Sequence, residues 1–108
     1  MNQDYNQKKT VDTAGVSKNN LKLVQEAMLN VTKSEAGTAH SVFGNYKIKV
    51  AAKTGTAENS GSDHTTFICY APYEKPEVAV AVVLEHGVKG TYSMQVARDM
   101  LDAYFNEK

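Results

Sequence analysis

The residues best suited to chemistry lie at positions 50–58, which read Val-Ala-Ala-Lys-Thr-Gly-Thr-Ala-Glu. The apolar first half is typical of a strand in a sheet core, and the polar second half is typical of a binding edge. An ammonium group in such a place needs a partner, because an unpaired buried charge carries a large desolvation cost. Lys53 and the hydroxyls of Thr54 and Thr56 suit a carboxylate. Gly55 lets another molecule approach the backbone, whose N–H groups suit a carbonyl oxygen.

A helix and a loop must bring this stretch into place. The pattern predicts a helix over residues 18–33, with Ser17 as its N-cap. Residues 34–45 contain two glycines and several small polar side chains, which predicts a loop. The strand itself is expected over residues 46–56, because apolar and lysine side chains alternate before the motif. The helix carries an apolar stripe that we expect to join the core, formed by Leu21, Val24, Met28 and Val31.

Two further strands and a closing helix follow the motif. Strands are predicted over residues 65–71 and 78–85, with a proline-bounded turn between them. The second of these strands is an unbroken apolar run, which indicates that both of its faces are covered. Thr91 or Ser93 is expected to cap the closing helix. Its predicted buried stripe consists of Ala97, Met100, Leu101, Tyr104 and Phe105.

This order predicts an α/β (α+β) fold with a three-stranded antiparallel sheet, because the connections are short enough for antiparallel neighbours. We expect the N-terminal and C-terminal helices to cover one face of that sheet. Residues 1–15 are polar and are expected to be an extended or flexible lead-in, with a short strand around residues 9–12. The folded unit is then expected to span residues 16–108.

A family resemblance rests on the motif and on its neighbours. Lys-Thr-Gly-Thr-Ala-Glu at positions 53–58 resembles the third signature motif of the penicillin-binding transpeptidases and their β-lactamase relatives. Gly-Thr-Ala at 37–39 precedes it and Phe-Ile-Cys-Tyr-Ala-Pro at 67–72 follows it. This order resembles the end of a class B penicillin-binding protein of the elongation type, related to penicillin-binding protein 2, and covers residues 16–108. One departure is Ala52, where related motifs often have glycine.

The resemblance implies a peptidoglycan D,D-transpeptidase that acts through an acyl-serine intermediate on stem peptides ending in D-Ala-D-Ala. It implies that Lys53 supports the electrostatics of the serine site and helps to attract the C-terminal carboxylate of the substrate. It also implies that the Thr54 and Thr56 hydroxyls, beside Gly55, bind this carboxylate or that of a β-lactam. The backbone N–H of Thr56 would be one oxyanion donor. No cofactor is implied.

The nucleophile of this family comes from a Ser-x-x-Lys motif, and no serine of this chain has lysine at the third following position. Ser-Lys-Asn at positions 17–19 matches the Ser-x-Asn pattern of the second motif, but it stands too close to Lys53, so we interpret it as a helix cap. We therefore expect the chain to supply the substrate-binding strand of a transpeptidase domain. It should be inactive without the missing N-terminal part of that domain.

The composition argues against several other classes. Of 108 residues, 42% are hydrophobic, which is enough for a folded core. Twelve basic and twelve acidic residues cancel, which argues against a nucleic-acid surface. The histidines His40, His64 and His86 lack a short ligand spacing, so no metal site is expected. Cys69 lies in an apolar run and is expected to be a small core residue.

The sequence contains no hydrophobic run near the roughly 20 residues of a membrane span and shows no signal peptide after Met1. The resemblance implies a parent protein anchored to the cytoplasmic membrane, with this domain on the extracytoplasmic side. In the resembling family a helical subdomain covers the second face of the sheet. Because this chain lacks that cover, we expect it to self-associate.

Two other functions stay open on the sequence alone. One is a non-catalytic binding or assembly module that carries Lys-Thr-Gly by chance, in which Lys53→Ala would leave substrate binding unchanged. The other is a fragment of a serine β-lactamase, which the hydrolysis rate of the parent protein would separate from a transpeptidase.

Overall fold

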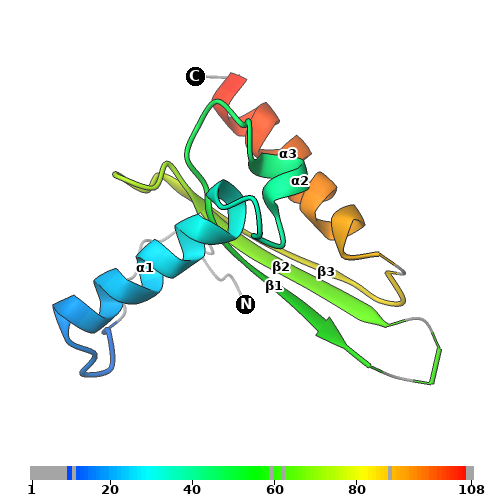
Figure 1. Cartoon of the computed structure of the whole chain (residues 1–108), viewed down its shortest axis with the longest axis horizontal. Coiled ribbons are helices and arrows are strands. Elements are labelled where there is room, and N and C mark those ends of the chain that lie inside the picture. The colour runs from blue at the N-terminus through cyan, green and yellow to red at the C-terminus, as the bar shows by residue number, and fades with distance from the viewer. Residues whose placement is uncertain (1–9, 11, 59, 62, 88, 107–108) are drawn as a thin grey trace, which may run out of the picture.

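Two helices, three strands and a closing helix follow one another along the chain (Figure 1). The computed structural model describes residues 10, 12–58, 60, 61, 63–87 and 89–106. The strand expected around residues 9–12 falls on positions of which only 10 and 12 are described. The elements are α1 (Lys18–Lys33), α2 (His40–Phe43), β1 (Ala51–Ala57), β2 (His64–Ala71), β3 (Val78–Leu84) and α3 (Gly90–Asn106).

Helix α1 begins and ends where its capping residues predict. The Ser17 hydroxyl accepts the N–H of Asn20 at 3.1 Å, which satisfies one of the first unpaired donors of the helix. At the other end, the chain turns sharply at Gly37. A Cβ atom there would lie 2.3 Å from the carbonyl oxygen of Val31, so only glycine fits. The Ser17 cap and the 18–33 helix are therefore confirmed.

The strands form one antiparallel sheet in the order β1–β2–β3. Ala52 stands opposite Cys69, and Cys69 stands opposite Val80, so these three side chains share one face. The adjacent row, which begins at Lys53, points to the other face because side chains alternate along a strand. The predicted α+β class and the three-stranded antiparallel sheet are confirmed.

Helices α2 and α3 cover the face that carries Cys69. Phe43 from α2 stacks on Phe67 from β2, with ring centroids 5.7 Å apart and planes 2° from parallel. Met94, Ala97 and Leu101 from α3 lie in the same buried cluster. Burying side chains of this size stabilises a fold by about 1.5–3 kcal/mol for each large residue. This cluster is the core of the described chain.

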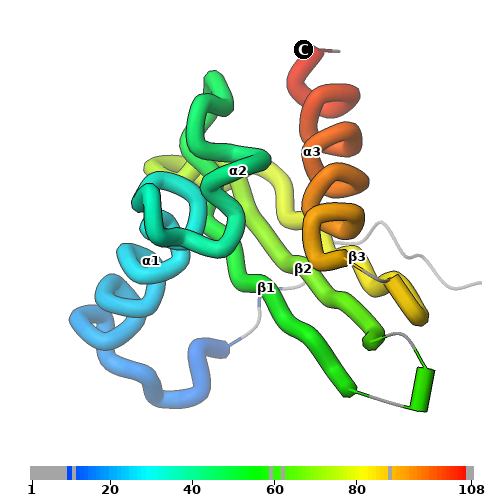
Figure 2. Tube along the Cα trace, turned by 45° about the vertical axis from the view of Figure 1, so that its right-hand side comes forward, coloured from blue at the N-terminus to red at the C-terminus, as the bar shows by residue number. Residues whose placement is uncertain are grey.

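Helix α1 lies against β1 and the opposite face, so the expectation that both long helices share one face is wrong. Met28 of α1 borders a groove with Ile68, Tyr70, Ala79 and Ala81, whose side chains point away from α3. Figure 2 shows α1 beside β1 and α3 beside β3, with the sheet between them. The physical reason is the tight turn at Gly37, which returns the chain from α1 to α2 on the other side.

Three details of the predicted elements are also corrected. Strand β1 begins at Ala51 rather than Tyr46, because Tyr46 turns into the core and its hydroxyl donates to the Asp102 carboxylate at 2.6 Å. The predicted loop 34–45 contains the short helix α2. Helix α3 starts at Gly90, where the Ser93 hydroxyl donates to the Gly90 carbonyl, so the expected cap is not formed by Thr91 or Ser93.

Burial differs from expectation on both helices and on β3. Leu21 and Val24 of the α1 stripe and Met100 of the α3 stripe are exposed, because these positions extend beyond the sheet or face away from it. Val83 is also exposed. Among the described residues, therefore, β3 is covered on one face only.

Cys69 lies in the core, as its apolar neighbours predict. Its side chain is almost fully buried, and burial raises the pKa of the thiol from 9.0 to about 11. The thiol is therefore protonated and unreactive near neutral pH.

We predict that the bond from Thr32 to Val50 stabilises the junction of α1 and β1. The buried Thr32 hydroxyl donates to the carbonyl of Val50 at 2.7 Å. Thr32→Val keeps the shape but leaves this buried carbonyl without its donor, so the free energy of unfolding should fall by about 1–3 kcal/mol in urea titrations. Thr32→Ser should lose less, and Thr91→Val at an exposed position should change little. Equal losses for valine and serine would contradict this assignment.

Candidate functional site

The candidate site lies on the half of β1 that leaves the core. Ala51 and Ala52 are fully buried, and the next residue, Lys53, is exposed. Thr54 and Gly55 are half-buried, and the strand ends in exposed residues. Because β1 is an edge strand of the described sheet, one side of its backbone is not used by a neighbouring strand there. The strand thus presents side chains and backbone groups together.

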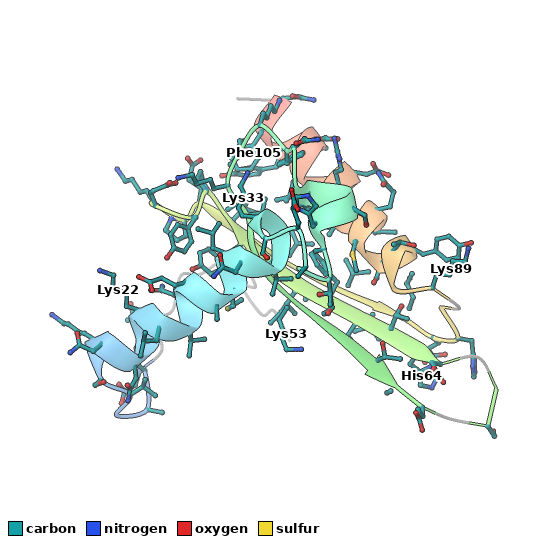
Figure 3. All side chains as sticks on the ribbon, viewed as in Figure 1. Lys22, Lys33, Lys53, His64, Lys89 and Phe105 are labelled. Carbon is teal, nitrogen blue, oxygen red and sulfur yellow. The ribbon has the colours of Figure 1, made fainter. Side chains whose placement is uncertain are left out.

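The Lys53 side chain projects from β1 away from the described body of the chain (Figure 3). Its ammonium donates to the carbonyl oxygen of Thr54. The ion pair found among the described residues joins Lys49 and Glu74 instead, at 3.0 Å. Within the described part of the chain, Lys53 is therefore a cation without a carboxylate, which an anionic ligand can satisfy.

A hydroxyl from outside β1, that of Thr38, is hydrogen-bonded to the motif. The Thr38 and Thr54 side-chain oxygens lie 2.9 Å apart and share one hydrogen bond. Thr38 stands in the short turn after α1, which is held by the bond from the Ala39 N–H to the Val31 carbonyl at 3.0 Å. A hydrogen-bonded turn therefore carries the hydroxyl that contacts Thr54. The sequence indicates residues 37–39 only through their family resemblance. No rule of residue spacing predicts the contact between Thr38 and Thr54.

Gly55 lies directly against a neighbouring side chain. A Cβ atom at Gly55 would lie 2.4 Å from the Thr66 hydroxyl oxygen on β2, directly opposite in the register. The Thr66 side chain therefore leans over Gly55 on the face that also carries Lys53. The expectation that Gly55 leaves room for another molecule is incomplete, because Thr66 uses part of that room. Thr66 was not anticipated from the sequence.

Thr56 and Glu58 lie at the open end of the strand. Both are exposed, and Thr56 stands opposite Thr65 at the end of the β1–β2 ladder. The structure therefore places Lys53, Thr54 and Thr56 on one short strand but on two faces of it: Lys53 lies on the face that carries Thr66, and Thr54 and Thr56 lie on the other face, with Thr38 beside Thr54.

A groove of about 270 Å³ lies beside this strand, between α1 and the open face of the sheet. Its lining is apolar and includes Met28, Ile68 and Ala81. Lys53 does not line it, but Lys53 pairs with Ile68 in the register, so the groove opens next to the motif row. Tyr70 forms another part of the wall, and burial raises the pKa of its hydroxyl, which therefore stays protonated.

The arrangement can bind an anion and orient an acyl group. The Lys53 ammonium on one face of the strand can attract a carboxylate, and a hydrogen bond to an ionised group is stronger than a neutral one. The Thr54 and Thr56 hydroxyls on the other face add neutral donors. No cluster of three metal-ligating side chains exists among the described residues. In the same part of the chain, no helix is both long and apolar enough to cross a membrane.

Comparison with known families identifies the class. Residues 2–102 match the model of the penicillin-binding protein transpeptidase domain. The chain therefore belongs to this family, as a C-terminal part of a class B transpeptidase domain of the penicillin-binding protein 2 type. The resemblance inferred from the motif is confirmed.

Individual relatives agree with this assignment. The peptidoglycan D,D-transpeptidase MrdA of Escherichia coli K12 is 34% identical over 96 residues, which are 74% of this chain and 15% of that protein. The crystal structure of Pseudomonas aeruginosa PBP2 in complex with WCK 5153 matches 80% of this chain with a TM-score of 0.71 and 33% identity. Penicillin-binding protein 2B of Streptococcus pneumoniae R6 matches 86% with a TM-score of 0.74 and 26% identity.

The chain spans only a small part of these relatives. It covers 15% of the Escherichia coli protein, 20% of the Pseudomonas aeruginosa chain and 16% of the Streptococcus pneumoniae chain. Residues 2–102, which match the family model, contain the motif strand, its two neighbouring strands and most of the closing helix.

We predict that Gly55 and Thr66 are energetically coupled. Gly55→Ala should lower the free energy of unfolding by about 1–3 kcal/mol, because the new methyl group overlaps the Thr66 hydroxyl. In the Gly55→Ala/Thr66→Ala variant this penalty should largely disappear, since the Thr66 Cβ lies 3.8 Å from the new atom. Gly90→Ala, which would meet only a flexible methionine end at 3.8 Å, is the matched control. Additive effects at positions 55 and 66 in thermal unfolding would refute the coupling.

Proposed function

We propose that this chain supplies the carboxylate-binding and oxyanion strand of a peptidoglycan D,D-transpeptidase. The observation that carries the proposal is an exposed lysine without a carboxylate partner among the described residues, followed directly by Thr-Gly-Thr on an edge strand. Lys53 draws the C-terminal carboxylate of the acyl donor towards the strand. The reaction class follows from the family to which the chain belongs.

The hydroxyls give the bound carboxylate its orientation. Thr54 and Thr56, which share the face opposite Lys53, donate to the two carboxylate oxygens at the outer edge of the strand, and Gly55 between them keeps the backbone accessible from one side. For Thr54 to donate outward, its oxygen must accept from Thr38, which lies 2.9 Å away. Thr38 therefore acts as a positioning residue that directs the Thr54 proton towards the ligand.

The backbone supplies the electrostatic part of catalysis. In the proposal the N–H of Thr56 donates to the oxygen that becomes negatively charged when the acyl carbonyl is attacked. Removing one such donor costs about 2.7–4 kcal/mol of transition-state stabilisation in acyl-transfer enzymes. The attacking serine and its lysine belong to protein outside this sequence, because no Ser-x-x-Lys occurs within it.

The substrates and the location follow from the same proposal. The acyl donor is a peptidoglycan stem peptide ending in D-Ala-D-Ala, and a β-lactam uses the same carboxylate contacts. Peptidoglycan lies outside the cytoplasmic membrane, so the parent protein would expose this domain on the extracytoplasmic side, held by a membrane anchor in another part of that protein.

The isolated chain should form no covalent adduct with a fluorescent penicillin. Acylation needs an activated serine, and this sequence lacks the serine–lysine pair that provides it. Denaturing gel fluorescence after incubation with the probe is the measurement, with Escherichia coli MrdA as the positive control. Labelling of a serine in the chain would contradict the proposal that the nucleophilic serine lies outside this sequence.

A hybrid enzyme tests the roles of Lys53 and Thr38. Grafting this chain in place of the matching segment of Escherichia coli MrdA should give a protein that penicillin acylates. Lys53→Ala should slow acylation by about 10²–10³-fold. Thr38→Val should slow it by up to about tenfold, the value of one neutral hydrogen bond, while Thr38→Ser should retain the rate.

The control in that experiment is Thr91→Val on the exposed start of α3. An unchanged acylation rate in Lys53→Ala would support a non-catalytic module instead. Equal acylation rates for Thr38→Val and Thr38→Ser would show that Thr38 does not position the ligand. The proposed role of Lys53 would be unaffected.

A further inference from the structure

The turn that follows β3 is held against the start of β2 by three contacts. The Gly87 N–H donates to the carbonyl of Asp63 at 2.9 Å, and the His86 N–H donates to the Nδ1 atom of His64 at 3.0 Å. A Cβ atom at Gly87 would lie 2.4 Å from the Thr65 hydroxyl oxygen, so the backbone of the turn lies directly against β2. We call the bond from the His86 N–H to His64 Nδ1 the His64 clamp.

This bond fixes the tautomer of His64. A backbone N–H can only donate, so the Nδ1 atom of His64 must accept through its lone pair. In the neutral imidazole the ring hydrogen is then on Nε2. A protonated imidazole carries a hydrogen on both nitrogens and accepts a hydrogen bond at neither. The His64 clamp therefore exists only while His64 is neutral.

His40 depends on its charge in a different way. Its Nδ1 atom lies 3.0 Å from the carbonyl oxygen of Thr32, and a carbonyl oxygen can only accept, so this ring nitrogen donates. Protonation of His40 keeps that N–H in place. A charged His40 therefore retains its hydrogen bond, whereas a charged His64 loses one.

A second imidazole lies beside the clamp. The ring centroids of His64 and His86 are 4.7 Å apart, and the ring planes are 53° from parallel. Two positive charges this close repel each other, so charging both rings adds to the effect of protonating His64. His86 also has a φ angle of 51°, a left-handed conformation that a residue other than glycine keeps only where its contacts hold it. Loss of the clamp removes one of these contacts.

Other charged groups near His64 do not change this direction. They belong to residues beside it in the sequence, at the end of β1 or on the turn: Glu58, Asp63, Glu85 and Lys89. No ion pair joins any of them to His64 in the described part of the chain. Charges at exposed positions interact weakly through water. The hydrogen bond lost at Nδ1 therefore decides how the turn responds to protonation.

The clamp lies at the end of the motif strand. His64 stands opposite Ala57, and Thr65 stands opposite Thr56, so the first residues of β2 pair with the last residues of β1. Figure 3 shows His64 at this end of the sheet, far from α1. The turn after β3 is held against the same part of β2. Release of the turn therefore removes a support from the strand pair that includes Thr56.

We propose that His64 is a pH-sensitive clamp: neutral His64 holds the turn after β3 on the start of β2, and protonation of Nδ1 releases it. The added proton occupies the lone pair that accepted the His86 N–H, and this N–H then donates to water. Histidine side chains change charge between about pH 5 and pH 8, so the release takes place in mildly acid solution. The clamp is formed entirely by described residues of this chain, so it does not depend on the reaction proposed above.

NMR spectroscopy of the nitrogen-labelled chain tests the tautomer and the release. At about pH 7.5, the ring nitrogens of His64 should show a hydrogen on Nε2 and a lone pair on Nδ1. During titration to about pH 5, the amide signals of His86 and Ala57 should shift together with the His64 ring. Protection of the His86 amide against hydrogen exchange should fall by about tenfold, the value of one neutral hydrogen bond.

Three outcomes of the titration would overturn the proposal. They are a hydrogen on Nδ1 of His64 at neutral pH, a His64 ring that stays neutral throughout, and a His86 amide that does not follow the ring.

Substitutions separate the hydrogen bond from the charge of the rings. His64→Asn keeps an acceptor, because its Oδ1 atom is attached to Cγ as Nδ1 is, but it does not titrate. This variant should keep the His86 amide protected at both ends of the titration. His64→Leu offers no acceptor and should leave that amide unprotected at either pH. An acid response in His64→Asn as large as in the unchanged chain would refute the clamp.

His86→Asn tests the contribution of the second ring. It keeps the backbone N–H, and asparagine tolerates a positive φ angle, so a smaller acid response at His64 should remain. Complete loss of the response would assign it to repulsion between the two rings and overturn the role of the hydrogen bond. His40→Asn is the matched control and should leave the response of the His86 amide unchanged.

Discussion

The hydrogen bond from the Thr32 hydroxyl to the Val50 carbonyl joins the end of α1 to the start of β1. The polar end of the strand depends on this junction. Ala51 and Ala52 follow it and are buried on opposite faces, so the strand cannot rotate about its axis. With the first half fixed, alternation of side chains places Lys53 on one face and Thr54 on the other. A binding residue can be exposed without being mobile only when its neighbours are held in this way.

The site is assembled from three parts of the chain that are distant in sequence. β1 provides the lysine and two threonines, the turn after α1 provides Thr38, and β2 provides Thr66 opposite Gly55. Each of the two supporting hydroxyls acts on a different motif residue: Thr38 bonds Thr54, and the Thr66 hydroxyl occupies the space that a Cβ at position 55 would need. The glycine in this motif is thus explained by packing within the sheet as well as by access for a ligand.

Two features of the described surface have no partner within the described residues: a groove and a sheet edge. On the face with Lys53, the groove beside Met28 and Ile68 lies next to the motif row. At the far edge of the sheet, β3 has no second neighbouring strand among the described residues. A chain that spans 15–20% of its relatives is expected to expose surfaces that a complete domain would cover.

The sequence by itself determined the local structure and the chemistry. Ser17 and the apolar spacing predicted α1, the β-branched runs predicted β2 and β3, and the motif at positions 53–56 identified the family, because caps, periodicity and short motifs are encoded by adjacent residues. Only the tertiary structure decided which face α1 occupies, where β1 begins, and that Thr38 and Thr66 join the motif. These features depend on contacts between residues far apart in the chain, such as Thr32 with Val50 and Tyr46 with Asp102, and no local pattern records such contacts.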